Sequence, residues 1–382
     1  MAIIGFLIGV ALILLILVEG FEAMVWPRRV TRPYRINRLF YRSSWTLWRA
    51  IAQRLHLGKR RETFLSIFGP LSMLTLFVIW VLGLIIGFAI MHWSLDTRLH
   101  VQQDEPEIGF STYFYLSGVT FFTLGYGEIT AATRFGRALT VCEAGLGFGF
   151  LAVVIGYLPV LYQAFSRREV TISLLDARAG SPPSAAQALV RIAQAHDLAA
   201  LDPFLAEWEH WSAELLESHL SFPALSYYRS QHDNQSWLAA LTAVLDTCSI
   251  LIAGVEGGCP YQAQLTFAMA RHAVVDLAMI FHTPPLPPDP DRLPAERLER
   301  IREVLSEVGF APREGLAFEA KLTELRAMYE PFVNALSQFL LFNLPPILPE
   351  KATVDNWQTS AWMRRVAGIG KLPLLEGDEH FD

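Results

Sequence analysis

Cysteine is scarce in this chain of 382 residues, and nucleotide-binding glycine motifs are missing from it. The three cysteines, Cys142, Cys248 and Cys259, have the spacing of neither a zinc site nor a disulfide framework. No Gly-x-Gly-x-x-Gly follows a strand-like segment, which argues against a dinucleotide-binding unit. Residues 167–382 carry 17 basic and 28 acidic residues, a formal charge of −11, so we expect no nucleic-acid partner.

Acidic residues are absent from one long segment near the start of the chain. Residues 27–61 contain eleven Arg or Lys and no Asp or Glu, which places this loop on the cytoplasmic side of a membrane. Apolar residues, 52% of the whole, concentrate in 2–26, 64–93 and 134–163. We therefore expect a multi-pass protein of the cell (inner) membrane, with its N-terminus outside and its C-terminal half in the cytoplasm.

A fourth apolar run, at 108–122, is too short to cross a bilayer. It is bounded by polar residues and lies between two spanning runs. Irregular backbone at membrane depth is tolerated only where protein or a water-filled pore surrounds it. The pattern predicts a re-entrant pore helix at 110–122, between an outer helix at 64–92 and an inner helix at 134–163.

The six residues that follow this run, Thr-Leu-Gly-Tyr-Gly-Glu at 123–128, carry the functional signal. Gly125 and Gly127 adopt backbone angles that other residues reach only with strain, so the segment can turn successive carbonyl oxygens toward one axis. Four copies around that axis would replace the water shell of a potassium ion. Such rings resemble those of a potassium-channel filter, and the resemblance implies that the K+ ligands are Thr123, Leu124, Gly125 and Tyr126 and that Gly127 lets the chain leave the axis.

This segment resembles the potassium-channel selectivity filter, which is commonly Thr-Val-Gly-Tyr-Gly-Asp. Gly136 and Arg137 follow Gly127 at the spacing of the simple two-helix channels, and Gly147 falls where those channels often carry a hinge glycine. Residues 64–163 as a whole resemble the bacterial ion-channel family with one pore unit per subunit. The resemblance implies a homotetramer, in which each chain meets three identical subunits.

The chain departs from that pattern at several positions. Leu124 replaces valine, Glu128 replaces aspartate, and Phe122 replaces a threonine at the cavity wall, which puts conductance in question. The carboxylate that some relatives carry behind the filter is absent, and Val119 stands there. We expect Tyr115 to form a hydrogen bond with Glu128 instead and to support the pore mouth.

Three residues of the inner helix are gating candidates. Glu143 is an ionisable group at membrane depth, and it either influences gating through its protonation or is a buried carboxyl without a regulatory part. Gly147 permits bending or close packing, and Pro159 removes a backbone donor and can kink the helix.

The basic loop has an internal helical pattern. Trp45, Trp48, Ala52 and Leu55 recur at three- and four-residue spacing. Arg38, Arg42 and Arg49 fall largely elsewhere, which predicts an amphipathic helix on the inner membrane surface with the arginines meeting anionic lipid. A lipid-sensing role and a passive anchor are both open, and the passive anchor is favoured.

The C-terminal half has helical periodicity throughout, in the segments 184–200, 203–220, 235–256, 260–283, 294–308 and 314–341. A proline-rich break at 284–288 divides them. His210 and Glu214 could share a metal, but a solvated helix face is the favoured interpretation. Two further groups of polar residues could together line a pocket for an unknown ligand, or could form a helix corner. The first group is Arg229, His232 and Asp233, and the second is Arg271, His272 and Asp276.

The sequence thus predicts an all-α membrane protein with no enzymatic activity. Its expected parts are an extra transmembrane helix at 1–26, a basic interfacial segment at 27–63, a pore domain at 64–165 and a helical cytoplasmic domain at 166–382. The expected function is passive potassium conduction, gated by the cytoplasmic domain. The alternatives are a weakly selective cation channel, and a membrane-anchored sensor or enzyme whose helical domain is the active part.

Overall fold

The computed structural model describes residues 2–26, 36–101, 108–194, 198–231, 234–254, 260–307 and 316–349, and most of these are helical. The chain divides into two compact units. Unit 1 comprises Met1–Ile51 and Ile67–Gln163, and unit 2 comprises Ala52–Ser66 and Ala164–Asp382.

The helices of unit 1 are those that the apolar runs and the amphipathic pattern of the basic loop predicted, with different ends. They are α1 (Ala2–Met24), α2 (Ile36–Ala52), α3 (Lys59–Ser94), α4 (Phe110–Phe121) and α5 (Arg134–Ala179). The first turns of α3 and the last turns of α5 belong to unit 2. The inner helix does not end at 163 as predicted, since α5 continues to Ala179.

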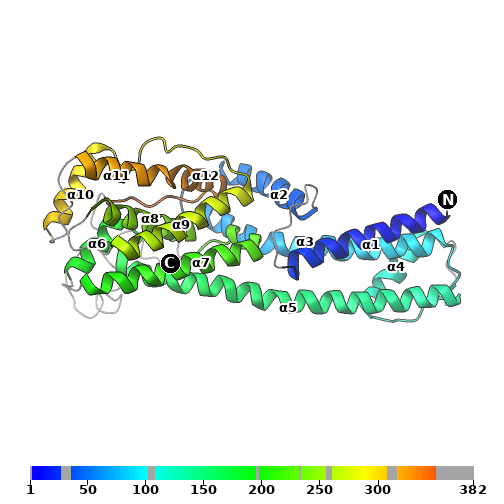
Figure 1. Cartoon of the computed structure of the whole chain (residues 1–382). Coiled ribbons are helices and arrows are strands. Elements are labelled where there is room, and N and C mark those ends of the chain that lie inside the picture. The colour runs from blue at the N-terminus through cyan, green and yellow to red at the C-terminus, as the bar shows by residue number, and fades with distance from the viewer. Residues whose placement is uncertain are drawn as a thin grey trace, which may run out of the picture. The chain divides into compact units, whose positions relative to one another are not determined.

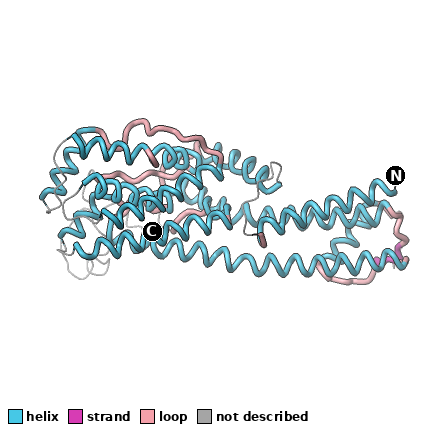
Figure 2. The backbone as a smooth tube through the Cα atoms, in the orientation of Figure 1, coloured by secondary structure: helices cyan, strands magenta, loops and turns pink. Residues whose placement is uncertain are grey.

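The short helix α4 lies between α3 and α5, and α1 lies along α3 (Figure 1). Small residues allow the close approach of α1 and α3: a Cβ placed on Gly9 would lie 2.6 Å from the Gly87 carbonyl oxygen. A two-stranded antiparallel sheet, which the sequence did not predict, pairs β1 (Leu99–Val101) with β2 (Ile129–Ala131). Figure 2 shows these strands near the start of α5.

In its described residues, unit 2 is a helical bundle formed by the start of α3, the end of α5 and seven further α-helices. These are α6 (Ala185–Gln194), α7 (Leu201–Ser221), α8 (Trp237–Gly254), α9 (Pro260–Phe281), α10 (Ala295–Glu307), α11 (Leu316–Ala327) and α12 (Glu330–Leu340), with 3-10 turns η1 (Leu198–Ala200) and η2 (Pro223–Tyr227). The central helix is α8, which packs against α6, α9 and α11, and every residue from Trp237 to Leu251 is buried.

One segment of unit 2 that the sequence predicted as a single helix forms two helices in the structure. The segment 314–341 divides at Met328 and Tyr329 into α11 and α12. Pro331 lies in the first turn of α12, where its missing N–H costs nothing. A continuous helix through this point would lose a hydrogen bond, so the chain restarts instead.

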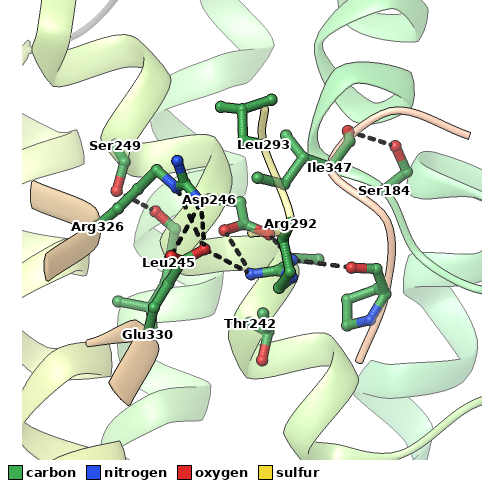
Figure 3. A network of polar contacts seen from close by, with 12 residues as sticks. Ser184, Thr242, Leu245, Asp246, Ser249, Arg292, Leu293, Arg326, Glu330 and Ile347 are labelled. Carbon is green, nitrogen blue, oxygen red and sulfur yellow. Dashed lines mark hydrogen bonds and ion pairs between the residues drawn. The ribbon is translucent and has the colours of Figure 1, made fainter. Parts of the chain in front are cut away.

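A buried network of charges ties α8 to the C-terminal part of unit 2 (Figure 3). Arg292 donates to Asp246 Oδ2 at 2.6 Å and to Glu330 Oε1 at 3.2 Å, and the Tyr329 hydroxyl donates to Asp246 Oδ1 at 2.5 Å. Arg326 pairs with Glu330 and Asp291. Since a buried charge is stable only when paired and hydrogen-bonded, these contacts fix how the loop carrying Arg292 docks.

Five described helices are long and apolar enough to cross a membrane, by length and composition alone. Three of them, α1, α3 and α5, are the spans that the sequence predicted. The other two, α8 and α9, lie in unit 2. The burial of α8 on all sides by neighbouring helices accounts for its apolar composition, because a helix that is apolar all round is expected in the core of a bundle.

Candidate functional site

The segment that resembles a filter begins as the C-terminal cap of α4. The Thr123 N–H donates to the Thr120 carbonyl at 2.9 Å, and the Leu124 N–H donates to the Val119 carbonyl, also at 2.9 Å. Thr123 has a φ of 56°, a left-handed conformation that usually requires glycine. This pair of bonds around a left-handed residue is a Schellman motif, and it fixes the direction in which the chain leaves α4.

The backbone then alternates in hand. Thr123, Gly125 and Gly127 have positive φ values of 56°, 60° and 83°. Leu124 and Tyr126, which lie between them, do not have a positive φ. In an ordinary strand successive residues face opposite sides. A reversal of hand at every second residue turns successive carbonyl oxygens toward the same side. The glycines at 125 and 127 adopt this geometry without a Cβ clash, as the sequence predicted.

The far end of the segment is held by three contacts within unit 1. The Tyr115 hydroxyl donates a hydrogen bond to the Glu128 carboxylate, so the contact expected from the sequence is present. Directly afterwards β2 pairs with β1, and the Arg137 guanidinium donates to the Ala131 carbonyl at 3.1 Å. This sheet was not predictable from the sequence, since both strands are only three residues long.

The side chains of the segment have little contact within their own chain. Tyr126 is 65% exposed, Leu124 is 53% exposed and Phe122 is 46% exposed. The ring of Phe122 contacts Phe121, with ring centroids 5.5 Å apart. Within the described residues of this chain, the Tyr126 ring is therefore left largely uncovered.

The gating candidates occupy different environments. Gly147 faces the end of α4, where a Cβ would overlap the Phe121 carbonyl oxygen. Glu143 is fully buried, with its carboxylate 3.9 Å from His92 Nε2. Pro159 lies inside α5, which continues beyond it.

In the amphipathic helix α2, the buried face is the one that carries the tryptophans. It is not the face of the arginines, which were expected to meet anionic lipid. Trp45 is 2% exposed, and its ring centroid lies 4.8 Å from that of Phe68 in α3. The tryptophan face therefore packs on protein, because the aromatic surface of α3 offers it a partner. Leu39, Leu47 and Ile51 are the exposed apolar residues of α2. Arg38 and Arg42 are also exposed, and Arg49 is half-buried.

The histidine and glutamate of unit 2 that could share a metal, although a solvated helix face was favoured, form a surface ion pair. His210 Nε2 lies 3.4 Å from Glu214 Oε1, and the histidine side chain is 78% exposed. Among the described residues, no group of three or more His, Cys, Asp or Glu is placed to hold a metal ion. His272 and Asp276 form a similar pair at 3.7 Å, in which the histidine is exposed and the aspartate is half-buried, and Arg271 is exposed beside them.

Arg229 is part of a helix corner. Its guanidinium donates to the Leu340 and Leu341 carbonyls at the end of α12 and lies 3.9 Å from the centroid of the Phe342 ring. It also pairs with Glu62 of α3 at 3.5 Å. Burial lowers the pKa of Arg229 to about 10, and nearby Glu62 opposes that shift. His232 and Asp233, which were expected to lie beside it, fall outside the described residues.

Arg168, near the end of α5, is a residue that the sequence did not single out. Its side chain is 2% exposed and donates to the Leu225 and Tyr228 carbonyls, each at 3.0 Å. It also pairs with Glu169 at 2.8 Å. His219 faces it at 3.3 Å, and burial together with the Arg168 charge holds the pKa of His219 well below its usual value. The segment from Leu225 to Arg229 thus contacts α5 through Arg168 and α3 through Glu62.

Comparison with known proteins agrees with this picture of unit 1. Residues 75–163 match the model of a family described as an ion channel. The chain is also 24% identical over 257 residues to the uncharacterized membrane protein YdjJ of Bacillus subtilis (strain 168), a match that covers 65% of this chain and 72% of that protein. No solved structure matches. These findings support a membrane protein of the ion-channel type, and they favour transport over catalysis.

Proposed function

We propose that this chain is one subunit of a tetrameric, potassium-selective channel. The observation that carries the proposal is the alternating backbone hand at Thr123, Gly125 and Gly127, which turns neighbouring carbonyl oxygens toward one side. Carbonyl oxygens stacked in rings replace the hydration shell of K+. The carbonyls of Thr123, Leu124, Gly125 and Tyr126, with the Thr123 hydroxyl at the inner end, are the proposed ligands.

One such segment cannot surround an ion, so the proposal requires four chains. The outward surface of α5 supports this requirement. Val141, Phe148, Ile155 and Tyr162 recur every seven residues and are each at least 62% exposed. Positions seven apart lie on nearly the same face of a helix. This apolar stripe, together with the exposed Tyr126 ring, offers a surface for three identical subunits around a shared axis.

The remaining parts of the proposal concern placement and control. The chain would lie in the cell (inner) membrane with its N-terminus outside, and Arg38, Arg42 and Arg49 would meet anionic lipid of the inner leaflet. The exposed Leu39, Leu47 and Ile51 of α2 fit such an interfacial position. Unit 2 would assemble the tetramer or gate it.

A flux measurement on proteoliposomes that contain the purified full-length chain tests the proposal. Gly125→Ala should abolish selective K+ uptake, because φ of 60° places a Cβ in a strained conformation that costs about 1–2 kcal/mol. Gly149→Ala is the matched control, since a Cβ there meets nothing within 4 Å.

Reversal potentials in mixed K+ and Na+ provide the second measurement. A wild-type channel that fails to distinguish the two ions would replace the proposal with a weakly selective cation channel. The absence of any ion flux from assembled wild-type protein would remove the proposal altogether.

A further inference from the structure

Three polar side chains from three helices meet behind the pore helix. They are His92 of α3, Ser117 of α4 and Glu143 of α5, and each is completely buried. Glu143 Oε2 lies 3.9 Å from His92 Nε2. The Ser117 hydroxyl faces the same carboxylate without forming a well-aligned hydrogen bond. We call these three residues the junction.

The polar atoms of the junction lack hydrogen-bond partners in the described part of the chain. Both carboxylate oxygens of Glu143, Nε2 of His92 and Oγ of Ser117 are buried, and none of them forms a hydrogen bond of ordinary length and alignment. The other ring nitrogen of the histidine, Nδ1, is 3.3 Å from the Thr97 hydroxyl, which orients the imidazole with Nε2 toward the carboxylate. A buried polar group without a partner costs about 1–3 kcal/mol, and an uncompensated charge costs more. The junction is therefore sensitive to its own state of protonation.

The surroundings of the junction supply little other charge. The Tyr113 hydroxyl of α4 donates to the Thr97 carbonyl at 3.2 Å, and Asp96, after the end of α3, is exposed. On α1, Glu19 lies near the C-terminal end of the helix and accepts a hydrogen bond from the Asn37 N–H. Among the described residues, His92 and Glu143 are thus the titratable groups that face each other here.

We propose that His92 and Glu143 bind one proton between them and, through Ser117, position the pore helix α4. With one shared proton the pair is an acid beside an imidazole, or a carboxylate beside an imidazolium, and both arrangements attract. Loss of the proton leaves a buried carboxylate without a counter-charge. Gain of a second proton leaves an imidazolium without a carboxylate.

The consequence for the pore follows from the position of Ser117. This residue lies in α4, whose final turn forms the Schellman motif that directs the segment 123–128. An unbalanced charge at the junction favours entry of water and separation of α3, α4 and α5, which weakens the support of that segment. This inference rests on the proposed channel function, and it makes His92, Ser117 and Glu143 positioning residues for the conducting segment.

The pH profile of K+ flux tests the inference in proteoliposomes that contain the full chain. Wild-type flux should fall on both sides of an optimum between about pH 5 and pH 8, the range in which histidine charge commonly changes. In Glu143→Gln and in His92→Gln, the fall in flux on at least one side of the optimum should be several-fold smaller than in wild type, since neither variant can share a proton. His100→Gln is the control, because His100 is exposed on β1 and outside the junction. A profile that both variants leave unchanged, or that His100→Gln alters equally, would overturn the inference.

A second readout separates this inference from the proposed function. The pH dependence of the thermal unfolding of the full chain in detergent does not require ion flux. The difference in melting temperature between wild type and Glu143→Gln should change with pH. The Ser117→Ala substitution should lower the melting temperature more when it is made in the wild-type chain than when it is made in the Glu143→Gln chain. Absence of flux with this pH linkage intact would count against the channel alone. A melting difference that is constant across pH would count against the junction.

Discussion

Gly147 of the inner helix α5 lies directly against the carbonyl oxygen of Phe121, the last residue of the pore helix α4. A side chain at this position would overlap backbone, which cannot move aside as a flexible side chain can. The absence of a Cβ at Gly147 therefore sets how closely α5 supports the start of the conducting segment. Close packing accounts for this glycine without a hinge.

Gly147→Ala should displace the end of α4 and reduce K+ selectivity. Overpacking of this kind typically costs about 1–3 kcal/mol. Gly145→Ala and Gly149→Ala serve as controls in the same helix, because a Cβ at either position meets nothing within 4 Å. Reversal potentials in mixed K+ and Na+ provide the measurement. Altered opening with unchanged selectivity in Gly147→Ala would instead favour a hinge.

Tyr115→Phe should speed inactivation of the channel several-fold. The substitution removes the hydroxyl that donates to Glu128 and leaves the ring in place. Single-channel recordings of Tyr115→Phe, Glu128→Gln and the double variant form a cycle. If the contact acts as a unit, the double variant should be no worse than the more severe single one. Wild-type inactivation in Tyr115→Phe would show that the contact does not stabilise the pore mouth.

Arg168→Lys should loosen the segment from Leu225 to Arg229. A lysine has no planar fork and cannot donate to the Leu225 and Tyr228 carbonyls in the way that the guanidinium does. Hydrogen exchange of the backbone amides in this segment should rise, and any control that unit 2 exerts on flux should weaken. Arg167→Lys is the control, since the Arg167 side chain is 71% exposed. Equal exchange in the two variants would contradict the role of Arg168.

Asp246→Ala should destabilise unit 2 by about 3–5 kcal/mol, because it leaves the buried guanidinium of Arg292 with an incomplete set of partners. Glu303→Ala removes the exposed partner of Arg300 and should cost less than about 1 kcal/mol. Chemical denaturation of the full chain, followed by tryptophan fluorescence, measures both. A loss in Asp246→Ala no larger than that in Glu303→Ala would mean that the network in Figure 3 contributes little to stability.

The helices of the pore region were predictable because their signals are local. Apolar length separates the runs at 64–93 and 134–163 from the short run at 108–122, and the structure has α3, α5 and α4 there. The left-handed glycines at 125 and 127 were predictable for the same reason. The end of α5 and the division between α11 and α12 were not, because tertiary packing extends the first and a single proline divides the second.

The sequence by itself determined the order of the apolar helices, the position of the turn-rich segment 123–128 and the partner of Glu128. Each depends on residues close together in the chain, or on spacing within one pore unit. Only the tertiary structure decided that His92 meets Glu143, that Gly147 meets Phe121 and that Arg168 holds the segment after α7. These contacts join helices far apart in sequence, and helical periodicity fixes which face a residue occupies but not which partner that face will meet.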